Sequence, residues 1–236
     1  MAKIKKIFTG MLVVGLCCIA AARGAEISAP EAPRPDVQVP AQLHIEGLPP
    51  LNGWMFRHDG KKADWLGIAF EGKTLNEPIN VIIADSHASS AGNAEARLLA
   101  ACEAADYKDR YGHSSDYMGF INGVLVPQFP SRRRHSFANK VFEETNNHGR
   151  IFGPVQYRGQ YWFLAAFSRE KVHFAPRPEH KFVSFNQARD DFGWRMNRTG
   201  RYLVKDFVRL DNAILGERDL SSGDHDGVAI LLQAVK

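Results

Sequence analysis

The sequence contains very little cysteine. Three cysteines occur in 236 residues, and two of them, Cys17 and Cys18, lie in an N-terminal segment that we expect to be removed. Only Cys102 then remains, so the mature chain has no second thiol with which to form an intramolecular disulfide. The alanine-rich surroundings of Cys102 indicate a buried structural thiol, because no group that would activate a nucleophile lies near it in sequence. The fold must therefore be stabilised by its hydrophobic core.

The sequence also lacks an apolar run of the roughly 20 residues that a membrane-spanning helix requires. Its N-terminus instead has lysines at positions 3, 5 and 6, an apolar stretch at 11–22 and small residues after it. This pattern predicts a secretory signal peptide over residues 1–24. We therefore expect an exported protein of the bacterial envelope, periplasmic or secreted. Any association with a membrane is expected to be peripheral, or to depend on an uncleaved signal.

The mature chain has no excess of charge of either sign. The full chain has 30 Lys and Arg against 26 Asp and Glu, but four of the basic residues and none of the acidic ones lie in residues 1–24. The remaining basic residues therefore balance the acidic ones. Because binding to nucleic acid needs a basic face on the folded domain, we expect no nucleic-acid partner. One local basic cluster, Arg132–Arg134, persists after this correction.

Proline is concentrated in residues 25–50, which contain six of the 12 prolines and no long apolar period. This composition predicts an extended linker. The rest of the chain, 51–236, shows no internal repeat and has the length of a single domain.

Short β-branched and aromatic runs separated by turn signals dominate this domain. Asn122-Gly123 predicts a hairpin with arms at 118–121 and 124–129. Arg158-Gly159 predicts a second hairpin, whose second arm, 160–167, is almost wholly apolar, as a central strand would be.

The other strands, loops and helices are predicted from sequence patterns that are less regular than those of the two hairpins. The runs Trp54–His58 and Trp65–Phe70 are predicted as strands, which could pair as a third hairpin, and a loop is expected at 145–150. The other predicted strands are 79–84, 136–143, 201–210 and 227–235. Helical spacing predicts one helix over 94–106, capped by Asn93, and another from Ser184 or Asn186 to about Met196. We therefore expect a mixed α/β (α+β) fold with a mixed sheet, several hairpins and about two helices.

Glycine is scarce where a phosphate-binding loop would need it. The loop after strand 79–84 contains only Gly92 and lacks the spacing of a dinucleotide or P-loop site, so we expect no cofactor. His113 and Asp116 are residue types that bind metals, but a solvated loop pair is the simpler interpretation. The run 224–227 lacks the full calcium-loop pattern and is interpreted as a tight turn. We therefore predict no metal site.

The ordered series of these segments resembles the LssY C-terminal domain family. The similarity extends over about 78–235 and rests on the following segments: Asn80–Ile83 and the alanine-rich helix after it, Arg132–His135, Ala165–Glu170, His180 before a helix with Ala188-Arg189-Asp190, and Gly223–Ala229. The resemblance implies an α/β domain without an established activity, of a kind found attached to membrane proteins, including phosphatidic-acid-phosphatase-type domains. The catalytic signature of those phosphatases is absent. Some acidic positions of the family pattern are replaced here, by Phe182-Val183-Ser184 and Asn186–Arg189, which favours binding over catalysis.

Two polar clusters are the candidate sites. The first is Arg132–His135, where strand alternation pairs Arg133 with His135 on one face and where guanidinium groups match the geometry of phosphate or carboxylate. The second is His180 with Arg189, Asp190 and Asp191. Arg169, which follows the apolar strand, is placed to join either cluster. In the simpler interpretation, the arginines form salt bridges at the surface or brace the helix against the sheet.

These residues lead to three alternatives. We expect a binding module for an anionic small molecule or envelope component, with Arg133, His135, Arg169, His180 and Arg189 as ligand-binding residues. The second alternative is a phosphoester hydrolase in which His135 and His180 act as acid and base, Arg133 and Arg169 stabilise developing charge, and Asp190 is a further catalytic candidate. The third is a structural or assembly module. The sequence favours a non-enzymatic role.

Overall fold

The computed structural model describes residues 41–113, 116–131, 134–174 and 179–236. The predicted signal peptide, most of the predicted linker, and Arg132 and Arg133 lie outside these residues. All described residues belong to one compact unit. The two helices are α1 (Ala91–Ala104) and α2 (Phe185–Arg198). The strands are β1 (Phe56–Arg57), β2 (Thr74–Leu75), β3 (Val81–Asp85), β4 (Lys108–Tyr111), β5 (Tyr117–Ile121), β6 (Val124–Phe129), β7 (His135–Ala138), β8 (Asn146–Tyr157), β9 (Gln160–His173), β10 (Glu179–Ser184), β11 (Tyr202–Arg209), β12 (Leu220–Ser221) and β13 (Val228–Ala234).

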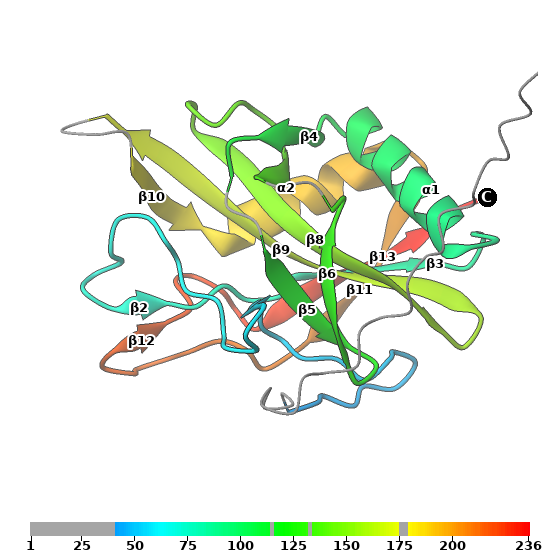
Figure 1. Ribbon diagram of the computed structural model, residues 1–236, viewed down its shortest axis with the longest axis horizontal. Coiled ribbons are helices and arrows are strands. Elements are labelled where there is room, and N and C mark those ends of the chain that lie inside the picture. The colour runs from blue at the N-terminus through cyan, green and yellow to red at the C-terminus, as the bar shows by residue number, and fades with distance from the viewer. Residues whose placement is uncertain (1–40, 114–115, 132–133, 175–178) are drawn as a thin grey trace, which may run out of the picture. The chain divides into compact units, whose positions relative to one another are not determined.

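Eleven of these strands form one mixed sheet, which confirms the predicted fold class. Its order is β1-β5-β6-β8-β9-β3-β13-β11, with β10 added to β9 and with β7 linking β4 to β8. The pair β3–β13 is parallel, and the other pairs of this sheet are antiparallel. Figure 1 shows the long strands β8 and β9 crossing the middle of the sheet, with both helices on one side and the segments around β2 and β12 on the other.

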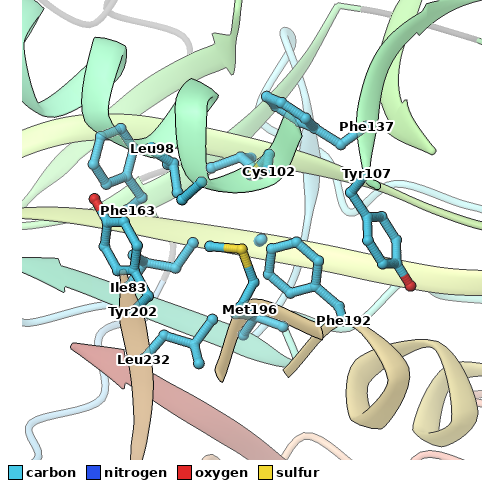
Figure 2. Packing of buried hydrophobic residues seen from close by; sticks show 14 of the residues in the cluster. Ile83, Leu98, Cys102, Tyr107, Phe137, Phe163, Phe192, Met196, Tyr202 and Leu232 are labelled. Atoms are coloured by element: carbon cyan, nitrogen blue, oxygen red, sulfur yellow. The ribbon is translucent and has the colours of Figure 1, made fainter. Parts of the chain in front are cut away.

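Alternation along β9 divides the core into two layers. Phe163, Ala165 and Phe167 point to the helix side, where they join side chains of α1 and α2 in one cluster. Trp162 and Leu164 point to the opposite side, into a second cluster. Figure 2 shows how Leu98 and Cys102 of α1 meet Phe192 and Met196 of α2 in the helix-side layer. Cys102 is fully buried there, as its sequence context predicts.

Local signals located several elements correctly. Asn122 and Gly123 both have positive φ in the β5–β6 turn, and Ser184 caps α2 by accepting a hydrogen bond from the Gln187 amide. α1 begins three residues earlier than predicted, because Ser90 accepts from the Asn93 amide and is the N-cap. No helix among the described residues has the length and apolarity to cross a membrane.

Three predictions are wrong for non-local reasons. Residues 145–150 are not a loop, because β8 starts at Asn146 and pairs with β9 from Glu170 back to Gln160. β1 pairs with β5 rather than with residues 65–70, so the predicted third hairpin does not form. The strand expected at 136–143 ends at Ala138.

The start of the packed unit also differs from the predicted boundary at residue 51. Leu48 is buried, and Leu43 and Ile45 pack against the second core cluster. The apolar side chains at the end of the proline-rich segment therefore belong to the core.

A buried asparagine ties the sheet to α2. Asn80 is fully buried, donates to the backbone oxygens of Phe167 and Phe185, at 2.9 and 3.4 Å, and accepts from the Phe167 amide at 2.9 Å. An amide side chain supplies both a donor and an acceptor, and an apolar residue would leave these backbone groups without partners.

We expect Asn80→Ala to lower the free energy of unfolding by about 2–4 kcal/mol, because each buried polar group left unpaired costs on the order of 1–3 kcal/mol. Urea denaturation measures this. Asn197→Ala is the matched control, since Asn197 makes one hydrogen bond at an exposed position, to the Val204 amide. Equal losses in the two variants would contradict the role assigned to Asn80.

Candidate functional site

The described residues form a cavity of about 320 Å³ on the face of the sheet opposite the helices. We call it the histidine cavity, because three histidines and three glutamates line it: His113, His148, His180, Glu77, Glu170 and Glu179. Arg150, Trp65, Leu66, Gly67, Gly112 and Phe142 complete its wall.

Strand register places the central polar side chains of this cavity. In the β8–β9 ladder, His148 lies opposite Ser168, and Glu170 lies opposite Asn146. β10 continues the sheet beyond β9, and its pairing puts Phe182 opposite Glu170 and His180 opposite Val172. Because alternate residues share a face, His148, Glu170 and His180 all point away from the helices.

Glu170 holds two of the imidazoles. One carboxylate oxygen is 2.9 Å from Nε2 of His148, and the other contacts Nδ1 of His180. All three side chains are at least nine-tenths buried. Burial alone would raise the pKa of Glu170, but the electrostatic attraction and hydrogen bonds of the His148 and His180 N–H groups outweigh it, and the pKa falls well below its ordinary value. Glu170 is therefore an anion that accepts N–H groups from both rings.

His113 completes the set of imidazoles from another part of the chain. It follows β4, and its backbone amide donates to the Arg134 carbonyl at 3.2 Å. Its ring is tilted against the ring of His148, with centroids 4.5 Å apart. Burial, together with the charges of His148 and Arg150, lowers the pKa of His113 to about 2, so this ring is neutral at neutral pH. His113 is only 3% exposed, so the solvated-loop interpretation is wrong for it.

Arg150 and Glu77 form a second buried pair in the wall, with Nη1 and Oε2 separated by 3.3 Å. Arg150 also lies over the ring of Tyr117, at 4.6 Å from its centroid. Burial raises the pKa of Glu77 to about 7, although the charge of Arg150 acts in the opposite direction. The guanidinium of Arg150 therefore already contacts the side chain of Glu77, which makes it less available to bind an anionic ligand.

Three polar atoms in this wall are buried without a hydrogen-bond partner among the described residues. They are Nε1 of Trp65, Nε2 of His113 and Nε2 of His180. Buried polar groups in folded proteins are almost always paired, with protein, water or a ligand. Their gathering on one cavity wall is therefore the strongest sign of a binding site.

The sequence-predicted residues do not meet in this cavity. Of the described candidates, only His180 lines it. Arg169 is next to Glu170 on β9 but points to the helix side, where Nη1 donates to Oδ1 of Asn147 at 3.1 Å. Arg169 and His180 are therefore on opposite faces of the sheet, and the structure does not form the catalytic arrangement that combines them.

The contacts of Arg189 and Asp190 are with other residues of the protein and hold α2 in place. Nε of Arg189 donates to Asp190 at 2.8 Å, and Nη1 donates to Asp226 at 2.7 Å and to the Val228 carbonyl at 2.8 Å. Its side chain is only 6% exposed. Arg189 thus fastens α2 to the start of β13, as the bracing interpretation expects.

His135 and Arg134 lie beside a different hollow, of about 490 Å³, which shares Gly112 and Phe142 with the histidine cavity. Nδ1 of His135 is 3.0 Å from Oδ1 of Asp109, and Arg134 lies over the ring of Tyr111. This hollow is lined by two arginines, Arg110 and Arg134, and by two acids, Asp109 and Glu143. The hollow has no net positive charge among its described residues.

Sequence reasoning missed most of the cavity wall. His148, Arg150 and Phe152 alternate as a half-buried strand would, but the asparagines and glycine among them indicated a loop. Glu170 extends the alternation of Trp162 and Leu164, which was the available signal that it points into the same layer.

Comparisons with protein-family models, curated proteins and solved structures find no match to this chain. Among the described residues, no group of three or more His, Cys, Asp or Glu side chains is arranged to hold a metal ion.

Titration of Glu77 gives a test of the cavity's burial. Its folded-state pKa is above the unfolded-state value of about 4.3, so the contribution of Glu77 to stability is fully present below that value and is lost as the pH rises to 7. We expect the stability of the wild type, relative to Glu77→Gln, to fall by about 2 kcal/mol between pH 5 and pH 8. Urea denaturation at both pH values measures it. A stability difference that does not change with pH would show that Glu77 is not buried as described.

Proposed function

We propose that the chain is an exported ligand-binding protein and that the histidine cavity holds its ligand. The observation that carries the proposal is the set of three buried, unpaired polar atoms on one cavity wall. Each such group costs on the order of 1–3 kcal/mol if nothing satisfies it. A bound molecule that supplies the missing partners would recover this free energy, which is how polar groups in a cavity give both affinity and orientation.

The resemblance to the LssY C-terminal domain family is part of this proposal. Glu170 and His180, which face each other in the cavity, both belong to the segments that carry the resemblance. Export is proposed from the charge and hydropathy pattern of residues 1–24.

An anion clamp built from the predicted residues has little support among the described ones. His135 and Arg189 each face a carboxylate, His180 faces Glu170, and Arg169 bonds to an amide oxygen. These groups lie on both faces of the sheet. We therefore place the ligand in the histidine cavity rather than at the arginine-rich segment.

General acid–base catalysis is the second candidate function. Glu170 contacts Nδ1 of His180 and leaves Nε2 buried and unpaired, and a histidine with one ring nitrogen bound to a carboxylate and the other unpaired can take or give a proton. The phosphoester version lacks support, because Arg169 is on the other face and Arg133 is outside the described residues. A purely structural role would fit the paired groups around Arg189, but it leaves the unpaired atoms of the cavity unexplained.

The test is to purify the exported protein without denaturation and to compare its native mass with the mass of the unfolded polypeptide. We expect wild-type protein to carry a small molecule that is released on unfolding, and His180→Ala to bind it at least tenfold more weakly, since loss of one buried hydrogen bond costs about 1.4 kcal/mol or more.

His135→Ala is the matched control, because His135 is outside the cavity, and it should retain the wild-type mass. Circular dichroism checks that both variants fold. If wild-type protein carries no ligand and no compound of a metabolite library raises its melting temperature, the proposal is wrong.

A further inference from the structure

The tautomer of His180 is set by its surroundings. Nδ1 contacts the carboxylate of Glu170, which is ionised and accepts hydrogen bonds only. Nδ1 therefore carries the proton when the ring is neutral, and Nε2 has a lone pair. Nε2 is buried without a hydrogen-bond partner in a residue that lines the cavity, so it is an unsatisfied acceptor at this wall.

Trp65 presents the opposite group. An indole N–H only donates, and Nε1 of Trp65 is buried in the same wall without a partner. Gly67 brings the two segments together: a Cβ at this position would lie 2.6 Å from Nε1 of Trp65 and would collide with the backbone oxygen of His180. The Ile68 amide also donates to that oxygen, at 2.9 Å. The Trp65 segment therefore packs against the backbone of β10 at His180, and both residues line the same cavity.

The charge of the wall disfavours an anionic ligand. Arg150 is the only Lys or Arg among the described lining residues, and it is paired with Glu77. Glu170 is an anion, and Glu179 is exposed at the rim. An anion would meet carboxylates and the lone pair of His180 rather than a free cation. Both oxygens of Glu170 are already occupied by imidazoles, which leaves them poorly placed to coordinate a cation.

The shape and the apolar part of the wall limit the ligand further. The volume of about 320 Å³ is at the small end of the range of ligand cavities. The ring of Phe142 lies against His180, with centroids 4.1 Å apart, and Leu66 is exposed at the mouth. A molecule that fits must be small and uncharged, must donate and accept hydrogen bonds on one side, and must present C–H groups on another.

We propose that the histidine cavity binds one uncharged sugar ring, with a hydroxyl group donating to Nε2 of His180 and a hydroxyl oxygen accepting from Nε1 of Trp65. Hydroxyl groups both donate and accept, which matches the two unpaired groups, and the C–H face of a pyranose packs against aromatic rings such as Phe142. This inference rests on the proposed function and narrows its ligand class.

The experiment is saturation-transfer NMR on the full mature protein with four neutral probes: glucose, galactose, mannose and N-acetylglucosamine. The 6-phosphates of the same sugars test for an anionic ligand, and Zn²⁺ in a parallel titration tests for a metal. We expect at least one neutral sugar to bind, and its 6-phosphate to bind at least tenfold more weakly.

Three variants assign the contacts. Trp65→Phe keeps an aromatic ring but removes the N–H, and Glu170→Gln removes the charge that fixes the tautomer of His180. Each should weaken sugar binding at least tenfold, whereas His135→Ala should leave it unchanged.

Stronger binding of the phosphorylated sugars, binding of Zn²⁺ that depends on His113 and His180, or no binding of any neutral probe would each overturn the sugar assignment. The proposed function fails separately, and only if the protein carries no ligand and responds to no library compound.

Discussion

The buried carboxylate of Glu170 is the group on which the rest of the site depends. An ionised carboxylate inside a protein is stable only when donors surround it, and here the donors are the rings of His148 and His180. Satisfying this charge orients both rings. The contact with Glu170 occupies Nδ1 of His180 and Nε2 of His148, and it leaves Nε2 of His180 without a partner. The chemistry that the cavity offers is therefore a consequence of how one buried charge is neutralised.

Strand alternation decides which residues take part. Arg169 and Glu170 are neighbours in sequence but point to opposite faces of β9, so one joins the polar contacts beneath α2 and the other joins the histidine cavity. The same alternation places Phe163, Ala165 and Phe167 in the helix-side core and Trp162, Leu164 and Glu170 on the opposite face. Adjacent residues of β9 thus serve different faces of the sheet: one face packs against the helices, and the other lines the cavity.

Local sequence signals predicted the features that local chemistry controls. The Asn122-Gly123 turn, the Ser184 cap and the burial of Cys102 follow from backbone conformation, hydrogen bonding and apolar surroundings. The start of β8 did not, because asparagines and a glycine disfavour a strand until β9 supplies a pairing edge. His148 and Arg150 lie in that segment, so missing the strand meant missing the cavity. Its remaining members come from segments distant in sequence, and only the folded topology brings them together.

We propose that Glu170 fixes the proton of His180 on Nδ1 and leaves Nε2 as an unpaired acceptor. Nitrogen-15 NMR of the histidine rings distinguishes the two tautomers directly. We expect the neutral ring of His180 in the ligand-free protein to be protonated at Nδ1 and unprotonated at Nε2, with the pattern altered in Glu170→Gln. A proton on Nε2 of His180 in the wild-type protein would contradict it.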